Sequence, residues 1–489
     1  MSIFRKKSLA ALLDQASHST LKRTLTAKSL VALGIGAIIG AGLFIRTAAA
    51  STQTSGPAVT LSFVIAAIGC ALAGLCYSEF AAMIPIAGSA YTYAYTTMGE
   101  LVAWIIGWAL VLEYALGAAT VAIGWSEYLN NLLGGNIPYQ WCHSPWQVSA
   151  TGIHGILNVP ALFIILLLTV LLMKGTQESA TVNAVIVTLK VGIVIAFIVV
   201  GWHFIQPANL TPYVIPPGTP GHEGIFQHGW GGVLGGAGIV FFAFIGFDAV
   251  STAAQETKKP ERDMPIGILG SLAICTILYI LFGYVLTGVC NWREFAVAGK
   301  EASVAYAAQH YMPGFGWLAT AITVAILLGF SSVILVMLLG QSRVFYTMAS
   351  DGLLPKLFSE VHPKFRTPYK CNIVLFFFVG AFAAIVPGDI TGDLTSIGTL
   401  FAFSLVCIGV WIMRRLEPAK HRPFRTPWVP VVPILGVIVC GGMIASLEHR
   451  TQFTALAWML FGLCIYFLYG KSHSQLNAAA RERMQTSLR

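Results

Sequence analysis

LGIGAIIGAGLF, at Leu33–Phe44, is the stretch of sequence that decides the fold, because it places four glycines inside an apolar segment. A second segment of this kind, GGVLGGAGIVFFAFIGFDA at Gly231–Ala249, follows about 200 residues later. Glycine disfavours a continuous helix, and two glycine-interrupted spans in matching positions are typical of a transporter site built from broken helices. The GxxxG spacing of Gly36 and Gly40 also fits simple helix packing. Packing would explain one segment alone, but the matching pair favours a site.

The composition predicts a membrane protein. Of 489 residues, 56% are apolar and 10% are charged, and the mean hydropathy is +0.75, whereas a soluble domain carries about 25% charged residues. The segment before residue 30 is polar and basic, so no cleavable signal peptide is expected. Apolar blocks long enough to cross about 30 Å of hydrocarbon predict twelve spans. These are 30–49, 57–84, 99–123, 160–174, 183–204, 233–254, 266–289, 316–346, 371–387, 391–413, 430–447 and 453–470.

The formal net charge of +9 predicts how the chain is oriented in the membrane. With the N-terminus inside, 24 of the 29 lysines and arginines fall in cytoplasmic segments, and Lys190 alone lies well inside a span. The opposite side holds Arg46, Arg293, Lys300 and Arg450. This bias follows the positive-inside rule, so the basic charge sets topology and is not a nucleic-acid surface.

The spans are expected to form two blocks of five, followed by a final pair. No Ser/Gly linker or soluble domain interrupts them, and the first and sixth spans are the two that carry the glycine runs. The predicted organisation is a cytoplasmic tail at 1–29, a first repeat at 30–204, a second repeat with its preceding external loop at 205–414, two additional helices with a preceding cytoplasmic loop at 415–470, and a cytoplasmic tail at 471–489.

Motifs of membrane enzymes, ATPases and potassium channels are missing from the sequence. The eleven histidines lie in tails, in loops or at span edges, and there is no HExxH, no Walker motif and no TVGYG filter. Nine cysteines show no CxxC and no metal-ligand spacing. A disulfide between Cys142 and Cys290 is left open, because sequence does not give their distance. We therefore expect a protein that is not an enzyme and that holds no cofactor or metal.

Six motifs, in family order between about residues 20 and 475, resemble the amino acid–polyamine–organocation superfamily. Within it, the chain is most similar to bacterial members of the cationic amino acid transporter family. The motifs are GIGAIIGAGLF, GSAYTYAYTTMGELVAWIIGW (Gly88–Trp108), FFAFIGFDAVSTAAQE (Phe241–Glu256), KKPERDMPIGI (Lys258–Ile268), SRVFYTMASDGLLP (Ser342–Pro355) and RPFRTPWVPVVPILG (Arg422–Gly436). The resemblance implies an all-α membrane protein of the LeuT type. It would have an inverted five-plus-five repeat, breaks in the first and sixth helices, and two extra C-terminal helices.

The resemblance also implies how an amino acid is bound. A broken helix exposes free amides at the positive end of one half and free carbonyls at the negative end of the other. The substrate carboxylate would meet the amides of Gly40, Ala41 and Gly42, and the family often has a hydroxyl residue at the position of Ala41. The ammonium would meet the carbonyls of Ile38, Phe242, Ala243 and Ile245. The Phe242 ring would cover the substrate as an outer gate; the alternative is a core- or lipid-facing phenylalanine.

Lys190 is the predicted proton-coupling residue. It lies about 10 Å deep in the fifth span, from the 1.5 Å rise per helical residue, between apolar neighbours in NAVIVTLKVGIVIAFIVV. A charged lysine at this depth costs several kcal/mol, so the amine can be neutral or charged in the physiological range. Its protonated form would brace the fifth span against the first near Gly34–Gly36. Snorkelling to the headgroups is the alternative, and the family often has a lysine here implicated in proton coupling.

Two further residues bear on the substrate side chain. Glu113, in the third span, is a mid-membrane ionisable group and so a site candidate. An ionised Glu113 facing the pocket would favour a cationic substrate, whereas a protonated one would only bond to its surroundings. Met337, in the eighth span, aligns with a pocket position that is small in animal family members that carry arginine. A methionine there would shorten the pocket, and steric exclusion favours small or neutral substrates.

These observations predict a proton-coupled symporter of small or neutral L-amino acids, such as alanine, in the bacterial inner membrane. The expected partners are the amino acid and membrane lipid, with a monomer as one possible state. A cationic amino acid transporter or an amino acid/amine exchanger is the alternative. Sodium coupling, with oxygens from Ser331 and Ser332, is disfavoured because the Lys190 ammonium would take the place of the ion. A non-transporting amino acid sensor is a further alternative.

Overall fold

The computed structural model describes residues 5–7, 25–84, 89–149, 151–175, 180–295 and 303–476. Within these ranges the chain is helical, and two isolated bridges are its only β-type pairings. In this part of the chain, eight helical segments are long and apolar enough to cross a membrane. Four shorter apolar helices accompany them: α2 (Ala27–Ile38), α8 (Val159–Met173), α15 (Tyr369–Ile385) and α17 (Val431–Ser446). The twelve predicted spans all fall on these helical segments.

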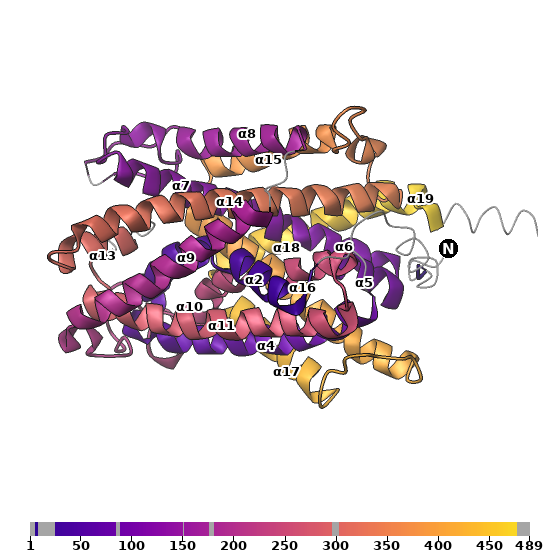
Figure 1. Ribbon diagram of the computed structural model, residues 1–489, viewed down its shortest axis with the longest axis horizontal. Helices are drawn as coiled ribbons and strands as arrows, with labels where there is room; N and C mark the ends of the chain where they lie inside the picture. The colour runs from indigo at the N-terminus through magenta and orange to yellow at the C-terminus, as the bar shows by residue number, and fades with distance from the viewer. Residues whose placement is uncertain are drawn as a thin grey trace, which may run out of the picture.

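The first half of the chain, as far as residue 210, is a series of helical elements whose α-helices are labelled in Figure 1. The symbol η marks a 3-10 or π-helical segment. After α2, the elements are η1 (Gly42–Arg46), α3 (Thr47–Ala50), η2 (Ser51–Ser55), η3 (Gly56–Ala58), α4 (Val59–Met83), α5 (Ser89–Thr97), α6 (Glu100–Val111), η4 (Leu112–Leu116), α7 (Gly117–Leu132), η5 (Tyr139–Trp141), α8, α9 (Ala180–Gly201), η6 (Trp202–Phe204) and η7 (Pro207–Leu210).

The second half begins with another interrupted helix. Its elements are α10 (Gly229–Val240), η8 (Phe241–Phe244), η9 (Asp248–Glu256), α11 (Pro260–Val289), α13 (Ser303–Tyr311), α14 (Gly316–Ser350), η10 (Lys356–Ser359), α15, α16 (Gly388–Leu416), α17, α18 (His449–Ile465), η11 (Tyr466–Gly470) and α19 (Lys471–His473).

Small residues let the long helices approach closely. A Cβ added to Gly107, Gly117 or Gly124 would lie 2.7–3.4 Å from Met348, Met337 or Phe330 respectively. Over these three pairs the residue number rises along α6–η4–α7 and falls along α14. The α6–η4–α7 helix therefore packs antiparallel on α14. Packing on small residues is how helices associate in lipid, where no hydrophobic force drives them together. The short α2 packs against α11 and α9 near the middle of the bundle (Figure 1).

The outer surface is apolar along the helices. Large side chains such as Phe163 on α8, Phe377 on α15 and Phe453 on α18 are 55–71% exposed. Exposed apolar residues that repeat on several neighbouring helices indicate a surface that faces lipid. A helix is suited to a lipid environment because it satisfies its backbone hydrogen bonds within one segment.

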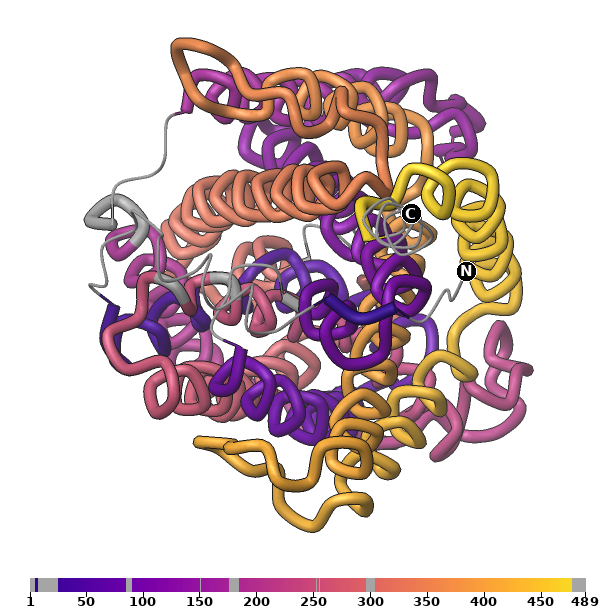
Figure 2. The backbone as a smooth tube through the Cα atoms, turned by 90° about the vertical axis from the view of Figure 1, so that its right-hand side faces the viewer, coloured from indigo at the N-terminus to yellow at the C-terminus, as the bar shows by residue number. Residues whose placement is uncertain are grey.

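Residues near the two ends of the chain pack at one end of the bundle (Figure 2). The Arg5 guanidinium donates to the Leu476 carbonyl at 3.3 Å, and the Lys7 ammonium pairs with Asp351 at 2.7 Å. Tyr466 donates to the buried Glu100 carboxylate at 2.9 Å. Both described end segments therefore lie on the same side of the bundle, as the even number of predicted spans requires.

Candidate functional site

The first helix is interrupted in the middle of the molecule. α2 ends at Ile38, residues Ile39 and Gly40 are not helical, and helix resumes at Ala41 and η1. Ile39 has φ −72° and ψ 95°, an extended conformation that stops the helix. These residues are buried, so the break exposes free carbonyls and free amides in the protein interior. This is where the sequence places the break.

The sixth helix has a longer interruption. α10 ends at Val240, η8 is a 3-10 turn, and η9 begins only at Asp248. Gly246, between them, has φ +113°, a conformation that glycine adopts readily and other residues rarely. A Cβ on Gly246 would also lie 2.8 Å from the Ala37 carbonyl oxygen of the first helix. The chain can turn here only because residue 246 has no side chain.

The two breaks lie against each other. A Cβ added to Gly42 would lie 2.1 Å from the Ala243 Cα and 2.5 Å from its backbone nitrogen. Backbone therefore touches backbone where the first helix resumes and the sixth helix ends its 3-10 turn. Of the residues predicted to bind substrate, the structure brings Ile38, Gly42 and Ala243 together directly, with Gly40 and Ala41 in the same segment.

Tyr279, on α11, joins the two breaks and was not predicted. Its hydroxyl lies 2.8 Å from the Ile38 carbonyl oxygen and 3.0 Å from the Ala243 carbonyl oxygen. The side chain is fully buried. One hydroxyl thus serves two carbonyls that the broken helices leave without a helical partner. The only signal in the sequence is a tyrosine inside the apolar run ICTILYILFGY, which is too common a feature to single out.

Lys190 is buried, and its Nζ donates to the Gly36 carbonyl oxygen at 3.1 Å. The aliphatic stem crosses α14 at Gly329, where a Cβ would lie 2.7 Å from the lysine Cε. The side chain therefore points into the protein and not toward the headgroups, so the snorkelling alternative does not apply. Beside it is a narrow apolar space, lined in part by Gly40, Phe44 and Phe330, that is too small for a water molecule.

Arg46 corrects one statement made from sequence, that Lys190 alone lies well inside a span. The side of the membrane assigned to Arg46 stays a prediction. Arg46 lies in η1, is 1% exposed, and forms an ion pair with Asp393 of α16. Asp389, one turn away, lies 3.7 Å from the same guanidinium. The sequence could not reveal this pair, because its members are 347 residues apart.

Glu113 lies in the π-helical turn η4 and is completely buried. Its carboxylate faces Asp248 and Thr399, both within hydrogen-bonding reach. The neighbouring Asp248 accepts a hydrogen bond from Tyr114 at 2.9 Å. Glu113 thus faces a second acid, and no basic group neutralises the pair within the described chain.

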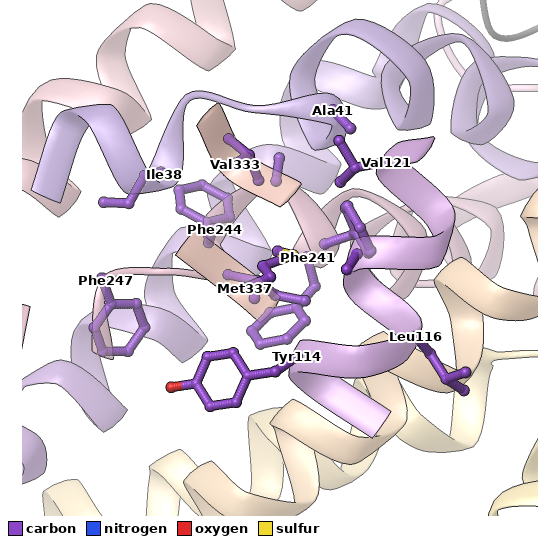
Figure 3. Packing of buried hydrophobic residues seen from close by; sticks show 14 of the residues in the cluster. Ile38, Ala41, Tyr114, Leu116, Val121, Phe241, Phe244, Phe247, Val333 and Met337 are labelled. Carbon is purple, nitrogen blue, oxygen red and sulfur yellow. The ribbon is translucent and has the colours of Figure 1, made fainter. Parts of the chain in front are cut away.

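Met337 and Phe242 belong to the buried apolar cluster around the breaks. Met337 is 6% exposed, and its sulfur would lie 3.0 Å from a Cβ on Gly117. Figure 3 shows it in one cluster with Phe241, Phe244 and Tyr114. Phe242 is 3% exposed within η8, so the lipid-facing alternative is excluded. Ile245 ends η8 and donates its N–H to the Phe242 carbonyl at 3.3 Å.

Two open points concern cysteine and serine. Cys142 and Cys290 are both free thiols, and the Cys142 sulfur lies 3.2 Å from the His143 ring. The Ser331 hydroxyl donates to the Leu327 carbonyl of its own helix at 2.8 Å. It is thus engaged with its own backbone.

Broken helices with buried backbone, surrounded by long apolar helices, define a multi-pass membrane transporter rather than an enzyme. A family model described as "Amino acid permease" matches residues 25–468. The branched-chain amino acid permease BcaP of Bacillus subtilis (strain 168) is 43% identical over 484 residues, covering 97% of this chain and 99% of that protein. The chain belongs to the amino acid permease family, within the amino acid–polyamine–organocation superfamily, which confirms the family predicted from its motifs.

Other relatives carry different names. The methylthioribose transporter of Bacillus subtilis (strain 168) is 39% identical over 479 residues, covering 97% of this chain and 99% of that protein. The cationic amino acid transporter 4, vacuolar, of Arabidopsis thaliana is 35% identical over 421 residues, covering 85% of this chain and 68% of that protein. The family is thus defined, while the names of its members span several substrates.

Proposed function

We propose that this protein takes up a neutral aliphatic L-amino acid together with a proton. The observation that carries the proposal is the contact between two broken helices at Gly42 and Ala243, with Tyr279 joined to both. An amino acid presents a carboxylate and an ammonium a few ångströms apart. Adjacent helix ends supply free amides for the first group and free carbonyls for the second.

The amides of Gly40, Ala41 and Gly42 would hold the carboxylate, since the positive end of the helix that starts there favours an anion. The ammonium would bind carbonyl oxygens at the C-terminal ends of the first halves of the two broken helices, those of Ile38, Phe242, Ala243 and Ile245. Two of these carbonyls already have a hydroxyl partner in Tyr279. An ammonium carries three donors, so it can share these carbonyls with Tyr279 and also reach the others.

The substrate side chain would extend toward Met337, with Phe242 as its outer cover. Met337 fills the space over Gly117, which shortens the pocket and disfavours a long cationic side chain. Relatives named as branched-chain amino acid permeases, at 43% and 33% identity, support a neutral aliphatic substrate. Glu113 lies beside Asp248, another acid, rather than beside a base. One proton shared by the two carboxyl groups would lower their negative charge and be compatible with a neutral substrate. A fully ionised pair would instead favour a cationic substrate.

Lys190 would couple transport to the proton. When protonated, its ammonium donates to Gly36 and holds α2 against α9 and α14. A neutral amine would hold that carbonyl less strongly, because hydrogen bonds from charged donors are about twice as strong as those from neutral ones. Loss of the proton would therefore free α2 to move, and substrate release would accompany deprotonation.

The architecture proposed with this function is twelve membrane crossings, arranged as two inverted repeats of five and a final pair. Both ends would be cytoplasmic, in a bacterial inner membrane, because the basic residues gather on that side. The shared location of Arg5 and Leu476 supports an even number of crossings.

Uptake of radiolabelled L-leucine and L-alanine into proteoliposomes tests the proposal. An inward proton gradient should drive accumulation in sodium-free buffer, and an added ionophore that collapses the gradient should stop it. Accumulation that requires Na⁺ would overturn proton coupling. Uptake that requires an amino acid or amine loaded inside the vesicles would indicate exchange, and binding without flux would indicate a sensor.

Competition defines the substrate class in the same assay. Neutral aliphatic amino acids should compete with labelled leucine, whereas arginine and methylthioribose should not. Methylthioribose is included because one relative is named for it, and it has neither of the two charged groups that the broken helices would hold. Competition by arginine alone would favour the cationic alternative.

A further inference from the structure

A groove opens beside the start of α11 and shares no lining residue with the two helix breaks. It has a volume of about 700 Å³ and lies between the first turns of α11 and the loop that joins α16 to α17. In Figure 1 this is the lower right of the molecule, where α11 and the loop before α17 approach each other. Its lining residues are Glu261, Arg262, Pro265, Ile266, Leu269, Gly270, His421, Pro423 and Phe424.

The loop that forms one wall is firmly attached. Arg414 donates two hydrogen bonds to the buried Glu79 carboxylate, at 2.8 and 2.9 Å, and the Thr426 N–H donates to the same carboxylate at 2.8 Å. Arg422 donates to the carbonyls of Lys420 and Glu417, each at 2.7 Å. These two arginines are therefore engaged in holding the loop, and the groove has a defined shape.

Arg262 and His421 differ from these structural arginines. Both line the groove, both are exposed, and neither pairs with an acidic residue within the described parts of the chain. The exposed Lys258, Lys259 and Arg425 lie close by in sequence and have no such pair there either. Glu261 is the one acid in the lining. Residues 258–263 carry three basic and two acidic side chains, and residues 417–425 carry three basic and one acidic. With His421 counted as neutral, the two segments that form the groove therefore have an excess of positive charge.

The other end of the groove is apolar and continues along the lipid-facing surface. Ile266 is 41% exposed, and Ile277, further along α11, is 61% exposed. α17, which like α11 packs on α4, exposes Val431 and Ile438 at 52% and 60%. Exposed apolar side chains therefore continue from the groove along α11, and α17 exposes others on the same bundle.

This combination identifies the kind of ligand. A basic face that is only solvated needs no apolar cleft, and a cleft for a soluble phosphate would not open along surface that faces hydrocarbon. An anionic phospholipid has both parts, and basic clusters at the cytoplasmic surface attract its headgroup. The positive-inside rule puts this end of the helical bundle on the cytoplasmic side of the membrane. The groove therefore lies at the level of those headgroups.

We propose that this groove binds one anionic phospholipid of the cytoplasmic leaflet. The phosphate contacts Arg262 and His421, and an acyl chain lies over Ile266 and Leu269 between α11 and α17. The site rests on the membrane orientation proposed above, but not on the identity of the transported substrate or on proton coupling.

Native mass spectrometry of the full chain in detergent, with added phosphatidylglycerol or phosphatidylethanolamine, tests this site. Wild type should retain one phosphatidylglycerol in preference to phosphatidylethanolamine. Arg262→Ala should weaken phosphatidylglycerol binding by about fivefold, the worth of one basic residue at an anionic surface. Lys364→Ala is the matched control, since Lys364 is an exposed lysine in a different loop and its ammonium lies over the Phe365 ring.

A second variant tests the acyl-chain part without changing charge. Ile266→Trp should fill the groove and lower retention of phosphatidylglycerol, while a thermal-unfolding midpoint equal to that of wild type shows that the variant is folded. Equal loss in Lys364→Ala, equal binding of phosphatidylethanolamine, or displacement of the lipid by water-soluble glycerol phosphate would overturn the proposal. Failure of transport coupling would leave these lipid measurements unaffected, so the two proposals fail separately.

Discussion

The two helix breaks solve the same problem in different ways. The first spans two residues, Ile39 and Gly40, and α2, which precedes it, accepts a hydrogen bond from Lys190 of another helix. The sixth is longer, turns at Gly246, and is held by backbone packing and by the Tyr279 hydroxyl. Both satisfy buried backbone groups, as they must in the membrane interior. Only the first uses an amine that can gain or lose a proton, so we expect pH to act on the first break.

Gly42→Ala should have the largest effect, because it separates the two breaks. The new Cβ would lie 2.1 Å from the Ala243 Cα, and backbone on both sides leaves no flexible group to yield. We expect uptake to fall by about a hundredfold, in line with displacements of about 1 Å at a functional site. Proteoliposome uptake measures it.

Gly40→Ala is the matched control for Gly42→Ala. Its Cβ would meet a Val333 methyl at 3.1 Å, a side-chain contact that can adjust by a small rotation. It should retain most uptake. Equal activity of the Gly42→Ala and Gly40→Ala proteins would show that the breaks do not need to touch.

Lys190→Ala should distinguish the first break from the sixth. Removal of the donor to Gly36 should lower pH-driven uptake by about fiftyfold, within the usual range of coupling energies, and the remaining uptake should no longer depend on pH. Counterflow of substrate should persist, because the substrate groups are untouched. Lys174→Ala, which removes an exposed lysine at the end of α8, serves as control. A pH dependence like that of wild type in Lys190→Ala would refute the coupling mechanism.

Asp393→Asn should show whether the second half of the first helix depends on its buried charge. The change removes the anion that faces Arg46 and should cost about 2 kcal/mol of stability, typical of a hydrogen bond to a charged group. A lower midpoint in a thermal-unfolding assay of purified protein measures it. Asp389→Asn is the control, since Asp389 is farther from Arg46, at 3.7 Å, and its side chain is 45% exposed. If the two variants unfold at the same temperature, burial of the Arg46 pair is not what holds η1.

Met337→Ser should enlarge the space between the breaks and the third helix. We expect the ratio of the apparent affinity for leucine to that for larger competitors to change by about tenfold. One or two methylene groups in a pocket are worth about 1–3 kcal/mol. Competition assays with phenylalanine and arginine measure this ratio. An unaltered ratio would make Met337 a packing residue without a role in specificity.

Tyr279→Phe should have the smallest effect, because both carbonyls keep other possible donors when substrate is bound. Loss of one hydrogen bond is worth about 1 kcal/mol, so the KM for substrate should change by about fivefold. Tyr284→Phe, on the same helix, is the control; Tyr284 packs its ring on Trp202. An identical KM in both variants would mean that Tyr279 has no part in the site.

The sequence predicted the helices and the position of the breaks for local reasons. Apolar runs of sufficient length dictate helices in lipid, and the two glycine-containing segments each hold a break, although the glycines at 231–238 lie within the continuous helix α10. The structure accordingly breaks at Ile39–Gly40 and at Gly246, inside the two glycine runs. The depth of Lys190 stays a prediction from counting residues along one span, and the structure shows that the side chain is buried in the protein.

What the tertiary structure decided is which distant residues meet. The Arg46–Asp393 pair, the Tyr279 bridge and the juxtaposition of Glu113 with Asp248 each join helices far apart in the chain. Hydrophobic pattern and glycine content depend on neighbours within a few turns, whereas these contacts depend on how whole helices cross and rotate. For that reason the sequence assigned Arg46 only to the outer end of the first span, and the packed bundle alone shows it buried against an acid.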